Sequence, residues 1–284
     1  MALLSTYWAW VVFAIWLYLP LFSFRYTRYF CAFSQTFLDG VAESAQLEPQ
    51  GIVKGSRFEQ RFAELFRVKP TSFIAAGSGI AAFVLRYRTA YVPAFLFRYR
   101  YVVRGTRYPD AQDDLLQSLR YLRAHADEFG IDPDKIGVMG FSAGGHLVMS
   151  SVELFDRSEW PCFVVPVYPV VTMTEPCVHK RSRRALLGES RVRNQKLRDS
   201  LSLERHVPDG CPPVFLVNCK DDQTVDYHNS ELLDSALTAH QVPHTYLQYK
   251  TGGHGFGASD VKGTAECRQW RSAFLEWVKE TCEN

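Results

Sequence analysis

The sequence has almost no net charge. Its 284 residues include 32 Lys and Arg against 30 Asp and Glu, which leaves a formal net charge of +2. Nucleic-acid-binding domains usually carry a strongly basic face, so this balance argues against nucleic acid as a partner. With 47% hydrophobic and 22% charged residues, the chain is also unlike a disordered protein or a small disulfide-stapled one. We expect a globular protein with a sizeable core.

Metal-binding patterns are missing from the sequence. The seven cysteines are an odd number, contain no C-x-x-C motif and show no spacing with histidine that suits a zinc site. We therefore expect no metal site, and we interpret Cys162 and Cys219, which lie in or beside strand-like runs, as small buried hydrophobic side chains.

Charged residues are absent from the first 24 positions. The segment 3–24 is 22 residues long, and as a helix it would reach about 33 Å, enough to span a bilayer. A signal peptide fits less well, because no Lys or Arg precedes the apolar run and no small-x-small cleavage pattern follows it. A buried or interfacial apolar helix is the third interpretation. We predict membrane association through residues 3–24.

Arg25 and Arg28 directly follow this apolar segment. If the segment spans a membrane, the positive-inside bias leaves the main domain on the cytoplasmic side. We favour a membrane-associated protein and leave a cytoplasmic or secreted location open.

From about residue 80 the sequence alternates between strand-like and helix-like segments. Short apolar runs predict strands, and apolar residues at helical spacing predict the helices between them. This alternation is typical of an α/β protein with a mostly parallel sheet and helices on both faces. The predicted strands are 80–87, 136–141, 162–165, 214–217 and 245–249, and the predicted helices are 110–129, 143–154, 227–240 and 266–280.

Two features interrupt this alternation. Pro161, Pro166 and Pro213 border predicted strands, and because proline cannot donate to a sheet ladder we expect them outside the central strands. Between residues 172 and 208 strand signals stop, and Arg and Lys are frequent. This insertion is either a solvated group of helices or a lid over a site at the sheet edge.

A G-x-S-x-G pattern, G-F-S-A-G at 140–144, stands between a predicted strand and a predicted helix. In this context the pattern forms a nucleophile elbow. Small residues around Ser142 permit a strained turn that lifts its Oγ above the sheet. The backbone N–H of Ala143 would then face the site as an oxyanion donor. A glycine-rich turn without chemistry is the alternative.

A serine hydroxyl is a weak nucleophile until a base accepts its proton. His254 lies in the glycine-rich loop G-G-H-G-F-G, residues 252–257, after the last predicted strand and before the last helix. The carboxyl ends of parallel strands meet at one sheet edge, where sites gather. We therefore predict that His254 is the base.

A carboxylate that orients the imidazole is expected after the strand 214–217. Asp221 and Asp222 both stand there, and a carboxylate in such a turn can instead cap the following helix. The chain order of serine, aspartate and histidine is that of α/β-hydrolases, and differs from the orders in chymotrypsin and subtilisin.

The stretch 130–147, G-I-D-P-D-K-I-G-V-M-G-F-S-A-G-G-H-L, resembles the esterase branch of the α/β-hydrolase superfamily that includes the bifunctional feruloyl and acetyl-xylan esterases. The resemblance runs from about residue 79 to 277 and implies an α/β-hydrolase fold. It also implies that Asp222 is the triad acid and that His146 is structural. The other stretches that agree are AFVLRYR (82–88), RYPD (107–110), SRRALLG (182–188), D-x-x-V (222–225) and 252–257.

These residues predict a serine esterase with Ser142, Asp222 and His254 as its triad and with no metal or organic cofactor. The resemblance implies acetyl or feruloyl esters of carbohydrate as substrates. A serine peptidase of the same fold is an alternative. We divide the chain into an apolar aromatic segment (1–24), a divergent region (25–78) and a catalytic domain (79–284) that contains the insertion 172–208.

One part of the family's pattern is missing. Such esterases carry an H-G-G-G or P-G-G-x-Y loop, about 25 to 30 residues before the AFVLRYR-like strand, that supplies a second oxyanion donor. Here only Gly55 and Ser56 stand at that distance. A hydrolase-like protein with impaired or no activity is therefore the second hypothesis. A related hypothesis is that the sequence before residue 79 is divergent or frame-shifted, so that some early strands of the fold are lacking.

Overall fold

The computed structural model describes residues 80, 83, 85, 87, 88, 90, 91 and 104–283. The predicted segments 1–24 and 25–78, with Gly55 and Ser56, lie outside these residues. The prediction that some early strands are lacking also falls on that part of the chain. Within the described part, no helix is both long and apolar enough to cross a membrane.

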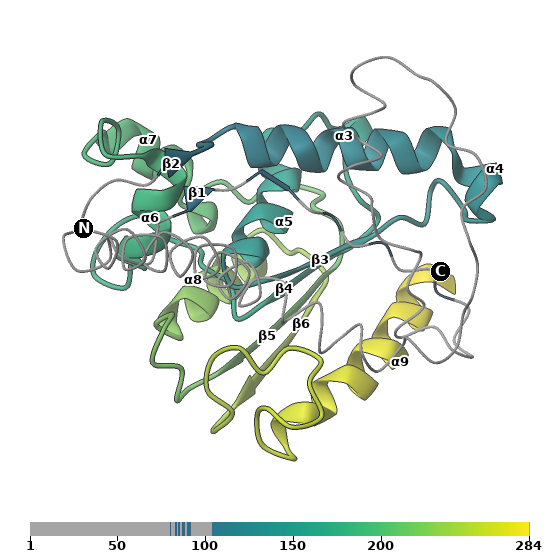
Figure 1. Cartoon of the computed structure of the whole chain (residues 1–284). Helices are drawn as coiled ribbons and strands as arrows, with labels where there is room; N and C mark the ends of the chain where they lie inside the picture. The colour runs from purple at the N-terminus through teal and green to yellow at the C-terminus, as the bar shows by residue number, and fades with distance from the viewer. Residues whose placement is uncertain are drawn as a thin grey trace, which may run out of the picture.

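A parallel sheet of four strands forms the centre of the described fold (Figure 1). Its strands follow one another in space in the same order as in the chain, and each pair is parallel. Connections between parallel strands must cross back over a sheet face, which is why helices separate the strands in sequence. The strands are β3 (Val138–Phe141), β4 (Val164–Val167), β5 (Val214–Cys219) and β6 (His244–Tyr249).

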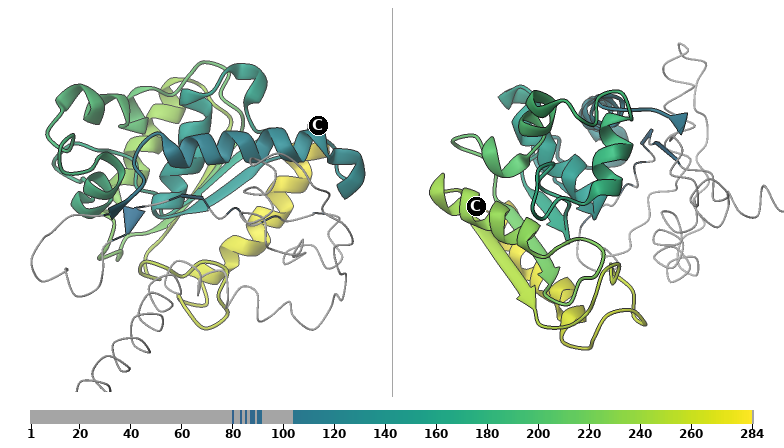
Figure 2. Two further views of the ribbon diagram at one scale, coloured as in Figure 1. Left: turned by 45° about the horizontal axis from the view of Figure 1, so that its top comes forward. Right: turned by 90° about the vertical axis from the view of Figure 1, so that its left-hand side faces the viewer.

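Helices cover both faces of this sheet, as the sequence predicted (Figures 1 and 2). In β5, Val214 and Leu216 belong to one apolar core, and Phe215 and Val217 belong to the other. Because side chains alternate between the faces of a strand, a strand buried on both sides reads as a continuous apolar run. The first core includes side chains of α3, α5 and α8, and the second includes side chains of α9.

The helices agree closely with the predicted ones. The predicted helix 110–129 is divided at His125, and Gly130 ends its second part in the left-handed conformation with φ 61°. In the described part of the chain, the helices outside the insertion are α3 (Asp110–Ala124), α4 (Ala126–Phe129), α5 (Ala143–Leu154), α8 (His228–Ala239) and α9 (Trp270–Glu283), with short 3-10 turns at Arg157–Glu159 and Cys267–Gln269.

The predicted strand 80–87 is not found among the residues that the structure describes there. Ile80, Phe83, Leu85 and Tyr87 lie outside any strand, although the last three pack against the core on the α3 and α5 face. Among the described residues, two short strands pair antiparallel before the central sheet, β1 (Ala90–Tyr91) and β2 (Arg104–Gly105).

The expectation that Pro166 lies outside a central strand is wrong. It lies within β4, between β3 and β5. On the β5 side, the N–H of Val164 donates to Pro213 O (3.0 Å) and that of Tyr168 donates to Val217 O (2.6 Å). Because alternate residues direct their N–H groups to the same neighbour, the missing donor of Pro166 falls between these two bonds. The ladder is interrupted there and continues on either side.

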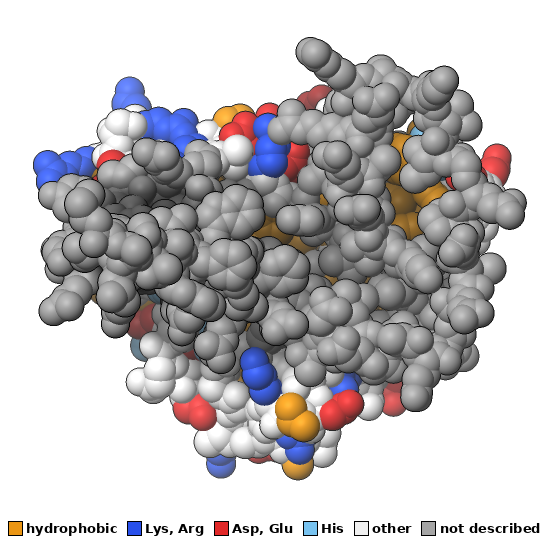
Figure 3. All heavy atoms as spheres, in the orientation of Figure 1, with side chains coloured by type: hydrophobic (Ala, Val, Ile, Leu, Met, Phe, Trp, Pro, Cys, Tyr) orange, Lys and Arg blue, Asp and Glu red, His pale blue; other side chains and the backbone are white. Residues whose placement is uncertain are grey.

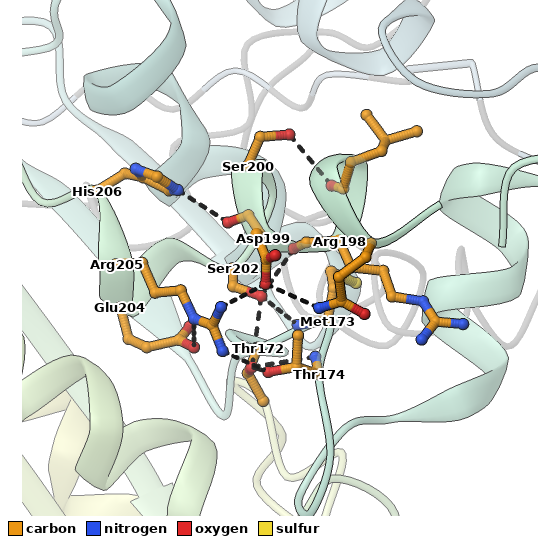
Figure 4. A network of polar contacts seen from close by, with 12 residues as sticks. Thr172, Met173, Thr174, Arg198, Asp199, Ser200, Ser202, Glu204, Arg205 and His206 are labelled. Carbon is orange, nitrogen blue, oxygen red and sulfur yellow. Dashed lines mark hydrogen bonds and ion pairs between the residues drawn. The ribbon is translucent and has the colours of Figure 1, made fainter. Parts of the chain in front are cut away.

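The insertion 172–208 contains helices and no strand. Its elements are α6 (Lys180–Leu187), α7 (Gln195–Ser200) and a 3-10 turn at Leu203–Arg205. The Ser202 hydroxyl accepts a hydrogen bond from the N–H of Met173 (2.9 Å) and donates one to Arg198 O (2.8 Å), which ties the end of the insertion to its beginning (Figure 4).

A small apolar core fixes the insertion to the sheet edge. Met173, Leu187 and Leu201 from the insertion pack with Val170 and with Val225, which lies three residues after Asp222. Basic side chains remain on its outer surface, since Lys and Arg atoms gather where α7 lies, at the upper left of Figure 3. The insertion is therefore anchored by an apolar core next to the carboxyl edge and is basic on the outside.

Glu153, near the end of α5, has a buried carboxyl group that should affect the stability of the fold. Neither of its carboxylate oxygens has a hydrogen-bond partner among the described residues, and both are buried. Burial, aided by the nearby Glu204, raises the pKa of the Glu153 carboxyl well above its usual value of 4.5. When the pKa of a carboxyl is higher in the folded than in the unfolded state, the protein becomes less stable as the pH rises above the pKa of the unfolded state.

We expect Glu153→Gln to raise the free energy of unfolding at pH 7, because the neutral amide replaces a carboxylate that is costly to bury without a hydrogen-bond partner among the described residues. The difference from wild type should disappear near pH 4, where the carboxyl is protonated in both states. Urea unfolding at the two pH values measures this, with the exposed Glu128→Gln as control. Equal stabilities of variant and wild type at pH 7 would contradict the expectation.

Candidate active site

The three residues predicted for catalysis meet at the carboxyl edge of the sheet. Ser142 follows β3, Asp222 follows β5, and His254 lies in the loop after β6. Since all four strands are parallel, these loops leave the sheet at the same edge, where α/β folds form their binding sites.

Ser142 occupies a strained turn between β3 and α5. Its backbone has φ 57° and ψ −117°, a combination that non-glycine residues rarely adopt. The turn requires small neighbours, because a Cβ on Gly140 would lie 2.1 Å from the carbonyl oxygen of Gly144. A Cβ on Gly145 would lie 2.8 Å from Cβ of Pro169. Crowding by the Gly144 carbonyl and by Pro169 therefore explains Gly140 and Gly145.

A chain of hydrogen bonds joins the three side chains. His254 Nδ1 lies 2.6 Å from Asp222 Oδ2, and His254 Nε2 lies 2.9 Å from Ser142 Oγ. A carboxylate can only accept, so Nδ1 carries the hydrogen and Nε2 is left to accept the hydroxyl hydrogen of Ser142. The imidazole is therefore oriented to take a proton from the serine.

Asp222 is almost completely buried, with 2% of its side chain exposed. Its second oxygen, Oδ1, accepts hydrogen bonds from the backbone N–H groups of Thr224 (2.8 Å) and Val225 (2.9 Å). With the histidine bond, these contacts compensate for removing the carboxylate from water. The valine of the D-x-x-V motif thus serves twice, since its N–H binds Asp222 and its side chain joins the core of the insertion.

Asp221 does not contact the imidazole in this arrangement. Its two carboxylate oxygens accept hydrogen bonds from the backbone N–H groups of Gly252 (3.1 Å) and Gly253 (2.8 Å). The neighbouring aspartates thus bind different parts of the same loop.

The predicted oxyanion donors are only partly described. Ala143 is the first residue of α5, where backbone N–H groups have no acceptor within the helix and the helix dipole favours negative charge. Its N–H is therefore available to an oxyanion beside Ser142. Gly55 and Ser56 lie outside the described residues, so the second donor stays a prediction.

His146, one turn into α5, is buried and serves a structural contact. Its Nε2 lies 2.9 Å from the carbonyl oxygen of Leu201, to which it must donate. Burial lowers the pKa of His146 to about 4, so the ring is neutral at physiological pH. It links α5 to the insertion and does not reach Ser142.

Tyr168 is a site residue that the sequence analysis missed. It directly follows β4 and has φ 36°, and its ring centroid lies 4.6 Å from that of His254. The tyrosine ring therefore packs beside the imidazole. The signal that could have identified it is its position at the carboxyl end of a parallel strand, but the predicted strand ended at residue 165, too early to indicate Tyr168.

In the described part of the chain, no group of three or more His, Cys, Asp or Glu side chains is placed to hold a metal ion.

A protein-family profile described as an alpha/beta hydrolase fold matches residues 88–258. The chain is 32% identical over 154 residues to endo-1,4-beta-xylanase B of Butyrivibrio fibrisolvens, and 33% identical over 148 residues to an acetylxylan esterase of Xylanibacter ruminicola. These matches cover 50% and 51% of this chain but only 24% and 30% of the relatives. The chain thus matches less than a third of the length of either relative.

A solved structure of similar architecture is that of an acetyl ester-xyloside bifunctional hydrolase from Caldicellulosiruptor lactoaceticus. It is 29% identical, superimposes with a TM-score of 0.64, and the match covers 84% of each chain. This similarity and the family match confirm the fold class predicted from the sequence.

The glycines after Ser142 provide a test of the turn. Gly145→Ala should destabilise the protein by about 1 to 3 kcal/mol, because the added methyl group overlaps Pro169 and overpacking carries such costs. Gly144→Ala should be tolerated, since its Cβ would meet only the Tyr87 hydroxyl oxygen at 3.7 Å, an ordinary contact. Denaturant unfolding of both variants measures this. Equal losses in the two variants would refute the crowding argument.

Proposed function

The chain belongs to the α/β-hydrolase fold family, and we propose that it is a serine esterase that cleaves acetyl-type carboxylic esters. The observation that carries this proposal is the position of His254, which contacts Ser142 through Nε2 and Asp222 through Nδ1. This arrangement makes a serine hydroxyl nucleophilic without a metal.

In the proposed acylation step, Ser142 Oγ attacks the carbonyl carbon of the ester while His254 Nε2 accepts the hydroxyl proton. The tetrahedral intermediate collapses as the bond between its carbon and the alcohol oxygen breaks, and His254 returns the proton to that oxygen. Water then attacks the acyl-enzyme by the same route, releasing the acid and restoring Ser142. Asp222 holds the imidazole and stabilises its positive charge in both steps.

The Ala143 N–H is the proposed donor to the negatively charged oxygen of each tetrahedral intermediate. It lies at the N-terminus of α5, where the helix dipole adds to the stabilisation. Loss of one oxyanion donor typically reduces turnover by about 10² to 10³. A second donor from Gly55 or Ser56 therefore matters to the rate, and a protein without one would be a poor enzyme.

The substrate class is proposed from the relatives. The acetylxylan esterase and the acetyl ester-xyloside bifunctional hydrolase both act on acetyl esters according to their names, and the latter aligns with most of this chain. We therefore favour acetyl esters on carbohydrate over feruloyl esters. Peptide substrates are less well supported, because no relative named above is a peptidase.

Hydrolysis of p-nitrophenyl acetate is the direct test of this function. We expect turnover by the wild type, a loss of about 10⁴-fold or more in Ser142→Ala, and a loss of about 10³ to 10⁴-fold in Asp222→Asn. Equal rates for the wild type and Ser142→Ala would exclude the proposal.

A fluorophosphonate probe separates the active from the inactive hypothesis. Covalent labelling of Ser142 in the folded wild type, absent in Ser142→Ala, supports a functional nucleophile. A folded protein that neither reacts with the probe nor hydrolyses p-nitrophenyl acetate fits the hydrolase-like protein without activity. Release of p-nitroaniline from alanine p-nitroanilide, with no release of p-nitrophenol from the ester, would favour the peptidase.

Membrane association through residues 3–24 is a separate proposal that rests on the sequence alone. A charge at the centre of an apolar membrane segment costs about 2.5 to 3.5 kcal/mol. We expect the full chain to stay with membranes after a carbonate wash and Val12→Arg to move into the aqueous fraction. Recovery of both proteins in the aqueous fraction would refute membrane attachment.

A further inference from the structure

We propose that Asp221 is a positioning residue, which holds the loop of His254 by its backbone so that the imidazole reaches Ser142. This inference rests on the proposed function for its catalytic meaning. It assigns a role to the aspartate that does not contact the imidazole.

The two adjacent aspartates bind the same loop at different points. Asp222 Oδ2 accepts from the His254 ring, whereas the two oxygens of Asp221 accept from the backbone N–H groups of Gly252 and Gly253, directly before the histidine. A carboxylate that accepts two backbone N–H bonds forms charge-assisted contacts, which are stronger than neutral ones. The histidine is therefore held both by its side chain and by the backbone that precedes it.

The loop needs such support because of its composition. Gly253, Gly255 and Gly257 have φ values of 68°, 79° and 46°, in the left-handed region that glycine enters without strain. The same freedom makes the unfolded or displaced loop entropically favourable, since glycine loses more conformational freedom on ordering than other residues. A loop this rich in glycine does not keep a histidine in place by its own stiffness.

Other contacts restrain the loop but do not replace Asp221. Gly252 packs so closely on the sulfur atoms of Cys219 and Cys267 that a Cβ there would lie 2.6 Å and 2.8 Å from them. At the far end, the indole N–H of Trp270 donates to the carbonyl oxygen of Gly257 (2.9 Å). Asp221 supplies the hydrogen bonds at the end nearest to the histidine.

The segment that carries Asp221 is itself fixed to the sheet. The N–H of Lys220 donates to the carbonyl oxygen of Tyr249 (2.9 Å), which joins the segment after β5 to the last residue of β6. Asp221 is the next residue, so it extends from a point fixed to the sheet. Removal of its carboxylate should widen the range of His254 positions while Ser142 and Asp222 keep their own places.

Kinetics of two Asp221 variants on p-nitrophenyl acetate test this role. Misplacement of a catalytic group by about 1 Å can cost 10²-fold, so we expect Asp221→Ala to lower kcat by about 10 to 100-fold with little change in KM. Asp221→Asn keeps one acceptor oxygen and should lose less, and it remains informative if the alanine variant folds poorly. The controls are Asp226→Ala and Asp226→Asn, on an exposed aspartate of the same segment, which should retain wild-type kcat.

A proton NMR measurement gives a readout that does not depend on turnover. In the wild type, the His254 Nδ1 hydrogen bonded to Asp222 should give a strongly downfield resonance, which Asp222→Asn abolishes and so assigns. We expect this resonance to broaden or shift in Asp221→Ala and to stay unchanged in Asp226→Ala. An unchanged resonance, kcat and KM in folded Asp221→Ala would overturn the inference.

The two proposals fail in different ways. A wild type that shows the downfield resonance but neither hydrolyses the ester nor reacts with the fluorophosphonate probe contradicts the proposed function and leaves the positioning by Asp221 intact. A wild type that hydrolyses the ester with no loss in folded Asp221→Ala contradicts the positioning role alone. A fall in thermal stability without any change in the resonance or in kcat identifies Asp221 as structural, which also contradicts the inference.

Discussion

The hydrogen bond between His254 Nε2 and Ser142 Oγ, 2.9 Å long, joins residues 112 positions apart in the chain. The distance between the two side chains depends on the parallel sheet, because each residue lies on a loop that begins at the end of a strand, and strand register sets where those ends lie. β3 is tied to β4 by pairs such as Phe141 with Val167, and β5 to β6 by pairs such as Cys219 with Tyr249. A change of register in any of these pairs would separate the serine from the histidine.

The two sides of this bond are held by opposite physical means. Ser142 lies in a tightly packed turn, since a Cβ on Gly140 or Gly145 would overlap the Gly144 carbonyl or Pro169. His254 is fixed by hydrogen bonds in a loop that has much conformational freedom of its own. The insertion adds a third support, because His146 and Val225 bind it to the helix after the serine and to the turn after the aspartate.

Much of the fold follows from local sequence patterns. Strands buried on both faces are continuous apolar runs, and the helices between them begin and end within a few residues of the apolar periodicity. Pro166 shows where such reasoning fails, since a parallel strand tolerates proline when only one ladder bond is lost. Tyr168 was missed for another reason. The predicted strand ended two residues before the end of β4, so the sequence did not place Tyr168 at the carboxyl end of a strand.

The sequence by itself predicted a nucleophile and a base, because the turn of Ser142 and the loop of His254 each need glycines close by, and short motifs record such local needs. Local reasoning from the residues left Asp221 and Asp222 equivalent, and only the resemblance to the esterase family favoured Asp222 as the partner of the histidine. Both are carboxylates at the same turn, and their partners lie 31 to 32 positions away in the loop after β6. Only the tertiary structure decided that one binds the imidazole and the other the glycine backbone, since adjacent side chains diverge and each takes the donor that the folded loop brings to it.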